Sequence, residues 1–217
     1  MRIFLNSMNR CPKTGKKNAF TVLELMMVMT VIAILASLVV PTFSKVKRSI
    51  SANQSKIQLN RYVFGLNAYY REYGYFPRIV HEDADLTPEE VITLNATASA
   101  NLIRALSGKE PEGARLSSAN EYLNPHGIQF IEFSDNDFKK LNETYDRSLL
   151  ADRFNNADIK LVVENNTDAD ALIPQSVFDH YLTIKDKVPS QGLREKIVFF
   201  TVGDRDQSMD VVSWKTD

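Results

Sequence analysis

The chain has little of what builds covalent or metal-held scaffolds, since its 217 residues include one cysteine and three histidines. Cys11 has no partner for a disulfide within the chain, and no cysteine pair is present for a metal site. The histidines, His81, His126 and His180, lie far apart in the sequence. Glycine and proline are also scarce, at 8 each, so the composition indicates one ordinary globular domain plus an additional segment.

The sequence motifs of common enzyme classes are missing as well. No G-x-S-x-G elbow, Walker phosphate loop or H-E-x-x-H zinc motif occurs. We therefore expect the chain not to be an enzyme, and a membrane-anchored periplasmic enzyme remains only as a lesser alternative. No cofactor is expected either, apart from the calcium considered below.

Charge is absent from a long stretch near the amino terminus. From Leu25 to Ser44 no residue is charged, and such a run covers about 30 Å, the thickness of a bilayer core, at about 1.5 Å per residue. It predicts a membrane-spanning helix over 20–43. The run is too long for a cleavable signal peptide, and no Ala-x-Ala pattern follows it. Glu24 stands near its start, where a carboxylate in hydrocarbon costs about 2.5–3.5 kcal/mol and so requires a partner or a function.

The net charge of −1 hides a strong separation of charge along the chain. Residues 1–19 carry five basic side chains and residues 42–71 carry six, with no acidic residue in either segment. Residues 72–217 carry 26 acidic and 15 basic side chains. Because both flanks of the apolar run are basic, the positive-inside rule does not orient it. The acidic remainder opposes binding to phosphates, so no nucleic-acid partner is expected.

The stretch "KKNAFTVLELMMVMTVIAILASLVVPTF" at 16–43 resembles the amino-terminal segment of type IV pilins and type II secretion pseudopilins, with their F-T-x-x-E-L pattern. In that family a prepilin peptidase cuts before the Phe and methylates the new amino group. Carried over, the cut falls between Ala19 and Phe20, where the family usually has Gly before the cut. The resemblance implies that Glu24 pairs with the amino terminus of a neighbouring subunit during assembly.

The resemblance implies four regions: a basic leader at 1–19, a transmembrane and assembly helix at 20–43, its continuation at 44–76, and an α+β head at 77–217. The long helix would pack on a small head with an antiparallel sheet. The protein would cross the bacterial inner membrane once, with a cytoplasmic amino terminus and a periplasmic head, and then enter a periplasmic filament. Implied partners are other copies of the chain, the prepilin peptidase, the inner-membrane assembly platform and the membrane.

The function implied is that of a structural subunit of a type II secretion pseudopilus that drives protein export. Within that family the chain is most like the major pseudopilin, which similarly ends its long helix in a cluster of Tyr, Gly and Pro. The alternative is a type IV pilus subunit for adhesion, motility or DNA uptake, because the shared amino terminus does not separate the two.

Past the apolar run, Pro41 lacks an amide hydrogen and is expected to kink or locally open the helix. Apolar residues then recur three or four positions apart from Leu59 to Tyr73, which predicts a helix face packed on the head. Gly74 suits a left-handed cap and Pro77 cannot continue a helix. The long helix is therefore expected to end in this cluster.

Beyond that point the pattern is typical of an α+β domain. Residues 87–107 predict a helix that Thr87 caps and Gly108 ends. Runs of β-branched and aromatic residues predict five strands, the last two of which form a hairpin. These strands are expected at 127–133, 158–164, 180–184, 196–202 and 210–214.

The loop between the last two predicted strands carries Asp204, Asp206 and Asp210. Some members of the resembled family bind calcium in this loop, and carboxylate oxygens are ligands that calcium prefers. The shortness of the loop and the presence of Arg205 favour a solvated turn. Structural calcium at these three aspartates is the alternative.

Overall fold

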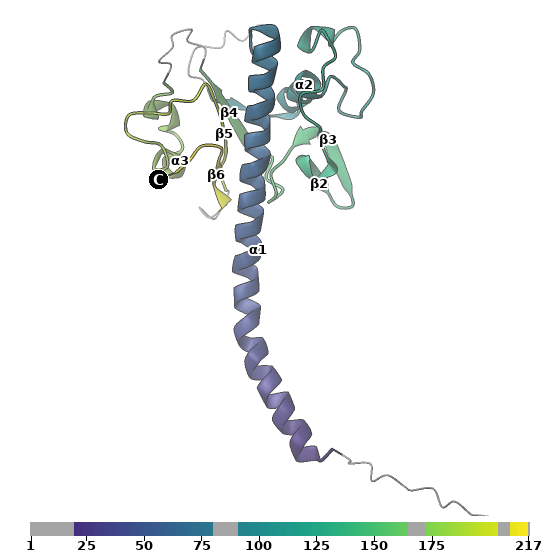
Figure 1. Cartoon of the computed structure of the whole chain (residues 1–217), viewed down its shortest axis with the longest axis vertical. Coiled ribbons are helices and arrows are strands. Elements are labelled where there is room, and N and C mark those ends of the chain that lie inside the picture. The colour runs from purple at the N-terminus through teal and green to yellow at the C-terminus, as the bar shows by residue number, and fades with distance from the viewer. Residues whose placement is uncertain (1–19, 80–90, 165–171, 204–208, 217) are drawn as a thin grey trace, which may run out of the picture. The chain divides into compact units, whose positions relative to one another are not determined.

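The computed structural model describes residues 20–79, 91–164, 172–203 and 209–216, and leaves the side chains at 38–42 undescribed. The chain is α+β with antiparallel sheets (Figure 1), and it divides into two compact units after Ser44. Its helices and strands are α1 (Val22–Tyr73), β1 (Ile92–Thr93), α2 (Ala96–Ser107), η1 (Glu121–Leu123), η2 (Asp135–Asp137), β2 (Phe138–Leu141), β3 (Thr144–Leu150), β4 (Ile159–Val163), η3 (Gln175–Phe178), α3 (Leu182–Lys185), β5 (Ile197–Thr201) and β6 (Val211–Val212).

Among the residues that the structure describes, no helix has both the length and the apolar character needed to cross a membrane. The membrane-spanning helix predicted over 20–43 is therefore wrong. The single-pass inner-membrane localisation, with its cytoplasmic terminus and periplasmic head, depended on that helix and is wrong with it.

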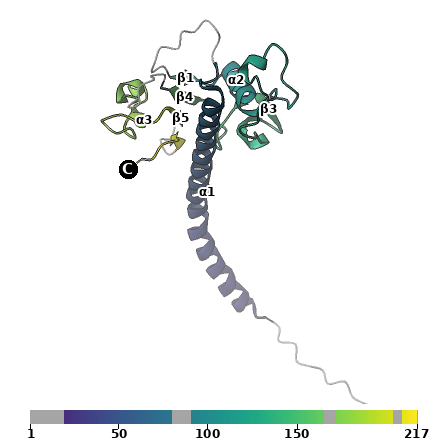
Figure 2. The ribbon, with the colours of Figure 1, turned by 45° about the horizontal axis from the view of Figure 1, so that its top comes forward.

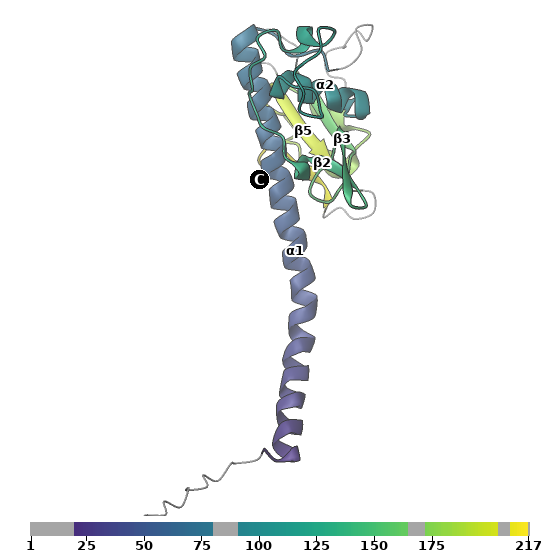
Figure 3. The same ribbon diagram turned by 90° about the vertical axis from the view of Figure 1, so that its right-hand side faces the viewer.

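In the second unit, residues 45–73 of α1 run along one side of the head (Figure 3). The predicted inner face is confirmed, because its large side chains are fully buried: Leu59, Tyr62, Leu66 and Tyr69. Gly65 lies on α1 where the helix approaches its neighbours, and a Cβ there would lie 2.9 Å from Ile131 Cγ2. A glycine in mid-helix thus permits close packing of α1 on the head.

The end of α1 follows the prediction. The helix ends at Tyr73, and Gly74 takes a left-handed φ of +78° while its N–H donates to the Tyr70 carbonyl at 2.8 Å. Glycine adopts this conformation without the steric cost of a Cβ, so Gly74 ends the helix without backbone strain.

The main sheet has the strand order β1-β4-β5-β6, with every neighbouring pair antiparallel. Figure 2 shows the first three of these strands in that order. Within the pairing of β4 with β5, Ile159 lies opposite Thr201 and Val163 opposite Ile197. Three of the five predicted strands, at 158–164, 196–202 and 210–214, are therefore confirmed, as is the hairpin of the last two.

The sheet is covered on both faces, which explains why every residue of β5 is buried. Ile197 and Phe199 join the core beneath α1 and α2. Val198 and Phe200, which alternate with them, join a second core with Phe178 and Trp214. Successive strand residues point to opposite faces, so a continuous apolar run is the expected pattern for a strand buried on both sides.

Two predicted strands are wrong, because their backbone groups bond to a helix end or within a turn. In 127–133, the N–H groups of Phe130 and Ile131 both donate to the Leu106 carbonyl at the end of α2, at 2.8 and 3.1 Å. In 180–184, the Tyr181 carbonyl accepts from Ile184 and Lys185, which opens the short helix α3. In both segments these backbone groups bond within a turn or to a helix end rather than along a strand ladder.

Helix α2 starts later than the sequence predicted. Asn95 caps it by accepting from the Ala98 N–H at 2.9 Å, and Gly108 closes it with a φ of +66° as expected. Thr87 lies outside the described residues, and β1 occupies part of the range assigned to this helix.

The hairpin of β2 and β3 was not predicted, because its strands are charged and half exposed rather than clearly alternating.

Candidate assembly site

The first turn of α1 is held by a reciprocal pair of hydrogen bonds between Thr21 and Glu24. The Thr21 N–H and hydroxyl donate to Glu24 Oε2 at 2.9 and 3.0 Å. The Glu24 N–H in turn donates to Thr21 Oγ1 at 3.2 Å. This is a capping box, in which two side chains satisfy backbone N–H groups that have no partner inside the helix.

These hydrogen bonds also set the charge of Glu24. The bond from the Thr21 backbone, followed by the bond from its hydroxyl, lowers the pKa of the carboxyl below its ordinary value. The Thr21 bonds stabilise the charged form, because donors aimed at a carboxylate favour its ionised state. Glu24 therefore carries a full negative charge at neutral pH.

The rest of this segment is apolar on all sides. Large apolar side chains stand more than half exposed at consecutive positions, and residues about 100° apart around a helix cover its whole circumference. Monomeric proteins rarely leave such a surface uncovered. The exposed apolar surface of the first unit is formed by Phe20, Val22, Leu23, Leu25, Met26, Met27, Met29, Val31, Ile32, Ile34, Leu35 and Phe43.

The hydroxyl groups in this segment are directed inward to the backbone. Thr30 Oγ1 donates to the Met27 carbonyl at 2.8 Å, and Ser37 Oγ donates to the Ile34 carbonyl at 2.7 Å. Both polar groups are thereby satisfied within the helix, so neither requires water or a partner. Glu24 is the only ionisable side chain described between Phe20 and Ser37.

The structure describes only some of the processing and assembly residues predicted from the sequence. Phe20, two residues before the start of α1, is 80% exposed, whereas Ala19 lies outside the described residues. Pro41 is inside α1, whose helical assignment continues through it, but its side chain is not described. The predicted cleavage and the expected kink stay predictions.

Of the three aspartates in the proposed calcium loop, the structure describes only Asp210, because Asp204 and Asp206 lie outside the described residues. Asp210 Oδ1 accepts from the Gly203 N–H at 2.7 Å, and its carbonyl accepts from Lys187 Nζ at 3.0 Å. Burial lowers the pKa of Lys187, while the charge of Asp210 acts in the opposite direction. Across the described ranges no cluster of three or more His, Cys, Asp or Glu could hold a metal ion.

Sequence reasoning missed the capping role of Glu24, although the sequence contains its signal. Thr21-Val22-Leu23-Glu24 is the T-x-x-E pattern that marks a helix start.

No family model, curated protein or solved structure matches the chain. The resemblance to pilins and pseudopilins therefore rests on the residues of this chain alone.

Proposed function

We propose that this chain is a structural subunit that assembles into a filament of the pseudopilin kind, through the amino-terminal part of α1. The observation that carries the proposal is the exposed apolar surface from Phe20 to Leu35, which surrounds the helix. A surface on one side of a helix is covered by one partner, but a surface on every side requires several. The core of a filament, packed from many copies of the same helix, supplies them.

The charge of Glu24 supports register within such a core. A carboxylate moved into an apolar interior is costly unless it is paired, and a paired charge fixes the position of its partner. Cleavage between Ala19 and Phe20 would create an amino group four residues before Glu24. Pairing between that cation and Glu24 of the next subunit is our hypothesis for how copies align.

A test of processing uses the full chain expressed with an active prepilin peptidase. Mass spectrometry should find a chain that begins at N-methylated Phe20, and electron microscopy should find filaments. Ala19→Gly, which restores the residue usual before the cut, should be processed at least as fast. Recovery of only uncut chains, together with an absence of filaments, would show the proposal to be wrong.

The capping role and the assembly role of Glu24 can be separated by three variants. Glu24→Gln keeps a side-chain oxygen that accepts from Thr21 but loses the charge, whereas Glu24→Val loses both. Thr21→Val removes the hydroxyl, and with it the acceptor of the Glu24 N–H, but keeps the charge of Glu24 and the backbone N–H that donates to it. If pairing drives assembly, both Glu24 variants abolish filaments and the Thr21 variant forms them.

The reverse result would assign Glu24 to capping alone. Filaments from Glu24→Gln at the wild-type yield, together with few filaments from Thr21→Val, would rule out the pairing. The start of the helix is monitored in each variant by amide hydrogen exchange at 22–25, so that a loss of assembly is not confused with fraying.

A further inference from the structure

In the second unit, α1 carries a regular stripe of side chains on the side that faces away from the head. Its apolar members are 50, 51, 69 and 67% exposed, respectively: Val46, Ile50, Ile57 and Phe64. Its polar members are all amides: Asn53, Asn60 and Asn67. We call these seven positions the seam. They are spaced alternately by four and three residues, which is the spacing by which one helix packs along another.

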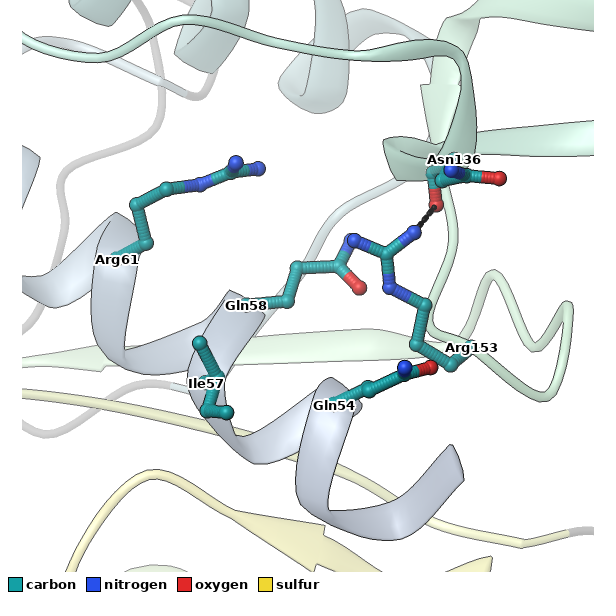
Figure 4. Close-up of a pocket in the computed structure, with 6 residues that line it drawn as sticks. All are labelled: Gln54, Ile57, Gln58, Arg61, Asn136 and Arg153. Atoms are coloured by element: carbon teal, nitrogen blue, oxygen red, sulfur yellow. Dashed lines mark hydrogen bonds between the residues drawn. The ribbon is translucent and has the colours of Figure 1, made fainter. Parts of the chain in front are cut away.

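The seam lies opposite the face of α1 that packs on the head. Three fully buried residues also recur every seven positions: Ser55, Tyr62 and Tyr69. At about 100° per residue, Ser55 lies about 140° around the helix from Ile50. Figure 4 shows Gln58 extending from α1 toward Arg153 of the head, whereas Ile57 does not reach across. The seam therefore remains exposed when α1 is packed on its own head.

The pattern of the seam is complementary to itself. When two copies of α1 lie parallel with their seams facing, apolar residues meet apolar residues and asparagine meets asparagine, either in register or after a shift of seven residues. An amide carries both donors and an acceptor, so two facing amides satisfy each other. No seam position is charged, so the facing residues themselves do not repel.

We infer that, in the assembled state, the seam packs in parallel along the seam of a second copy of the chain, with asparagine opposite asparagine. This inference rests on the proposed function, because the seam alone is weak. Three of its positions are polar, and basic residues flank it at Lys47, Lys56 and Arg61. Copies that the first unit has already gathered meet at a high effective concentration, at which a weak contact forms. The seam then aligns the copies and leaves each head on the far side of its helix.

The first test places cysteines in the seam of the full chain, in a Cys11→Ser background that removes the only native thiol. Packed helices lie about 8–10 Å apart and their Cα atoms about 2.3 Å from each axis, so facing Cα atoms come within about 4–6 Å, the range of a disulfide. Asn53→Cys and Asn60→Cys, alone or coexpressed, should yield about tenfold more disulfide dimer in filaments than Glu72→Cys. Glu72 is the matched control, because it is an exposed residue of α1 outside the seam.

The outcomes of cross-linking separate this inference from the proposed function. Filaments at the wild-type yield, with no more dimer from the seam cysteines than from Glu72→Cys, would overturn the inference alone. An absence of filaments from the Cys11→Ser chain itself would overturn both.

A second test distinguishes a second copy from a charged partner. If seam meets seam, Asn60→Asp and Asn60→Lys each bring like charges face to face, so both should lower the filament yield several-fold at an unchanged melting temperature. An acidic protein surface or an anionic lipid would be repelled by Asn60→Asp and attracted by Asn60→Lys, so opposite effects of the two variants would overturn the inference. Asn142→Asp, at the exposed turn between β2 and β3, makes the same change away from the seam and should leave the yield unchanged.

Discussion

At the scale of single residues, Glu24 shows how one carboxylate can have two explanations. The exposed apolar run makes the acid look like a site for pairing, whereas the Thr21 hydrogen bonds make it an ordinary helix cap. The two roles are compatible, because a cap lowers the pKa and keeps the charge that pairing requires. The variants proposed above decide whether the charge has a use beyond the cap.

Glu110 provides a residue-scale prediction about pH. Its carboxylate accepts from Arg104 Nε at 2.6 Å, Asn120 Nδ2 at 2.9 Å and the Ser117 N–H at 3.1 Å. Burial by itself raises the pKa of Glu110, but the three hydrogen bonds and the charge of Arg104 together lower it to about 2, from 4.5. The stabilisation from Glu110 is therefore fully present above about pH 4.5 and is lost as the pH falls toward 2.

Glu110→Gln should reduce the free energy of unfolding at pH 7 by about 1–2 kcal/mol, because it weakens a charge-assisted network. The difference from the wild type should shrink as the pH falls below about 4.5. Urea unfolding of both proteins from pH 7 down to below pH 4.5 measures this difference in the free energy of unfolding. Glu112→Gln, at an exposed position, is the control. A difference that stays constant with pH would contradict the assigned cause.

At the scale of elements, α1 follows from its sequence because helix periodicity and capping are local. The buried positions of its inner face recur at three or four residues, and Gly74 ends it by its own conformation. The segment 127–133 shows the opposite case. Its apolar alternation is typical of a strand, but its N–H groups bond the carboxyl end of α2, a partner that periodicity does not indicate.

The two faces of α1 in the second unit give an element-scale prediction. Leu66 is fully buried in the main core, whereas Phe64, two residues away, is 67% exposed. Leu66→Ala should lower the free energy of unfolding by about 2–5 kcal/mol, from lost burial and the cavity left behind. Phe64→Ala should change it by less than about 0.5 kcal/mol. Equal losses in chemical denaturation would show that the helix is oriented differently.

At the scale of the whole molecule, the division after Ser44 separates two kinds of surface. The second unit contains both hydrophobic cores, while the described part of the first unit has exposed apolar side chains around its helix. Self-association should therefore depend on the first unit, and folding of the head on the second.

A chain of residues 45–217 should fold cooperatively and remain monomeric in analytical ultracentrifugation, because both cores lie within it. The full chain at the same concentration should form large assemblies, since apolar surface removed from water favours association. Comparable self-association by 45–217 would place the assembly surface in the head and contradict the proposed site.

The sequence by itself determined the features that depend on near neighbours: the inner face and end of α1, the strands β4, β5 and β6, and the Gly108 cap. Each follows from side-chain periodicity or from the backbone preference of a single residue. Only the tertiary structure decided which distant residues meet. It joined β1 to β4, and it brought Arg61 and Arg153 to the buried Asp137, because packing of α1 on the head rather than any local pattern sets those distances.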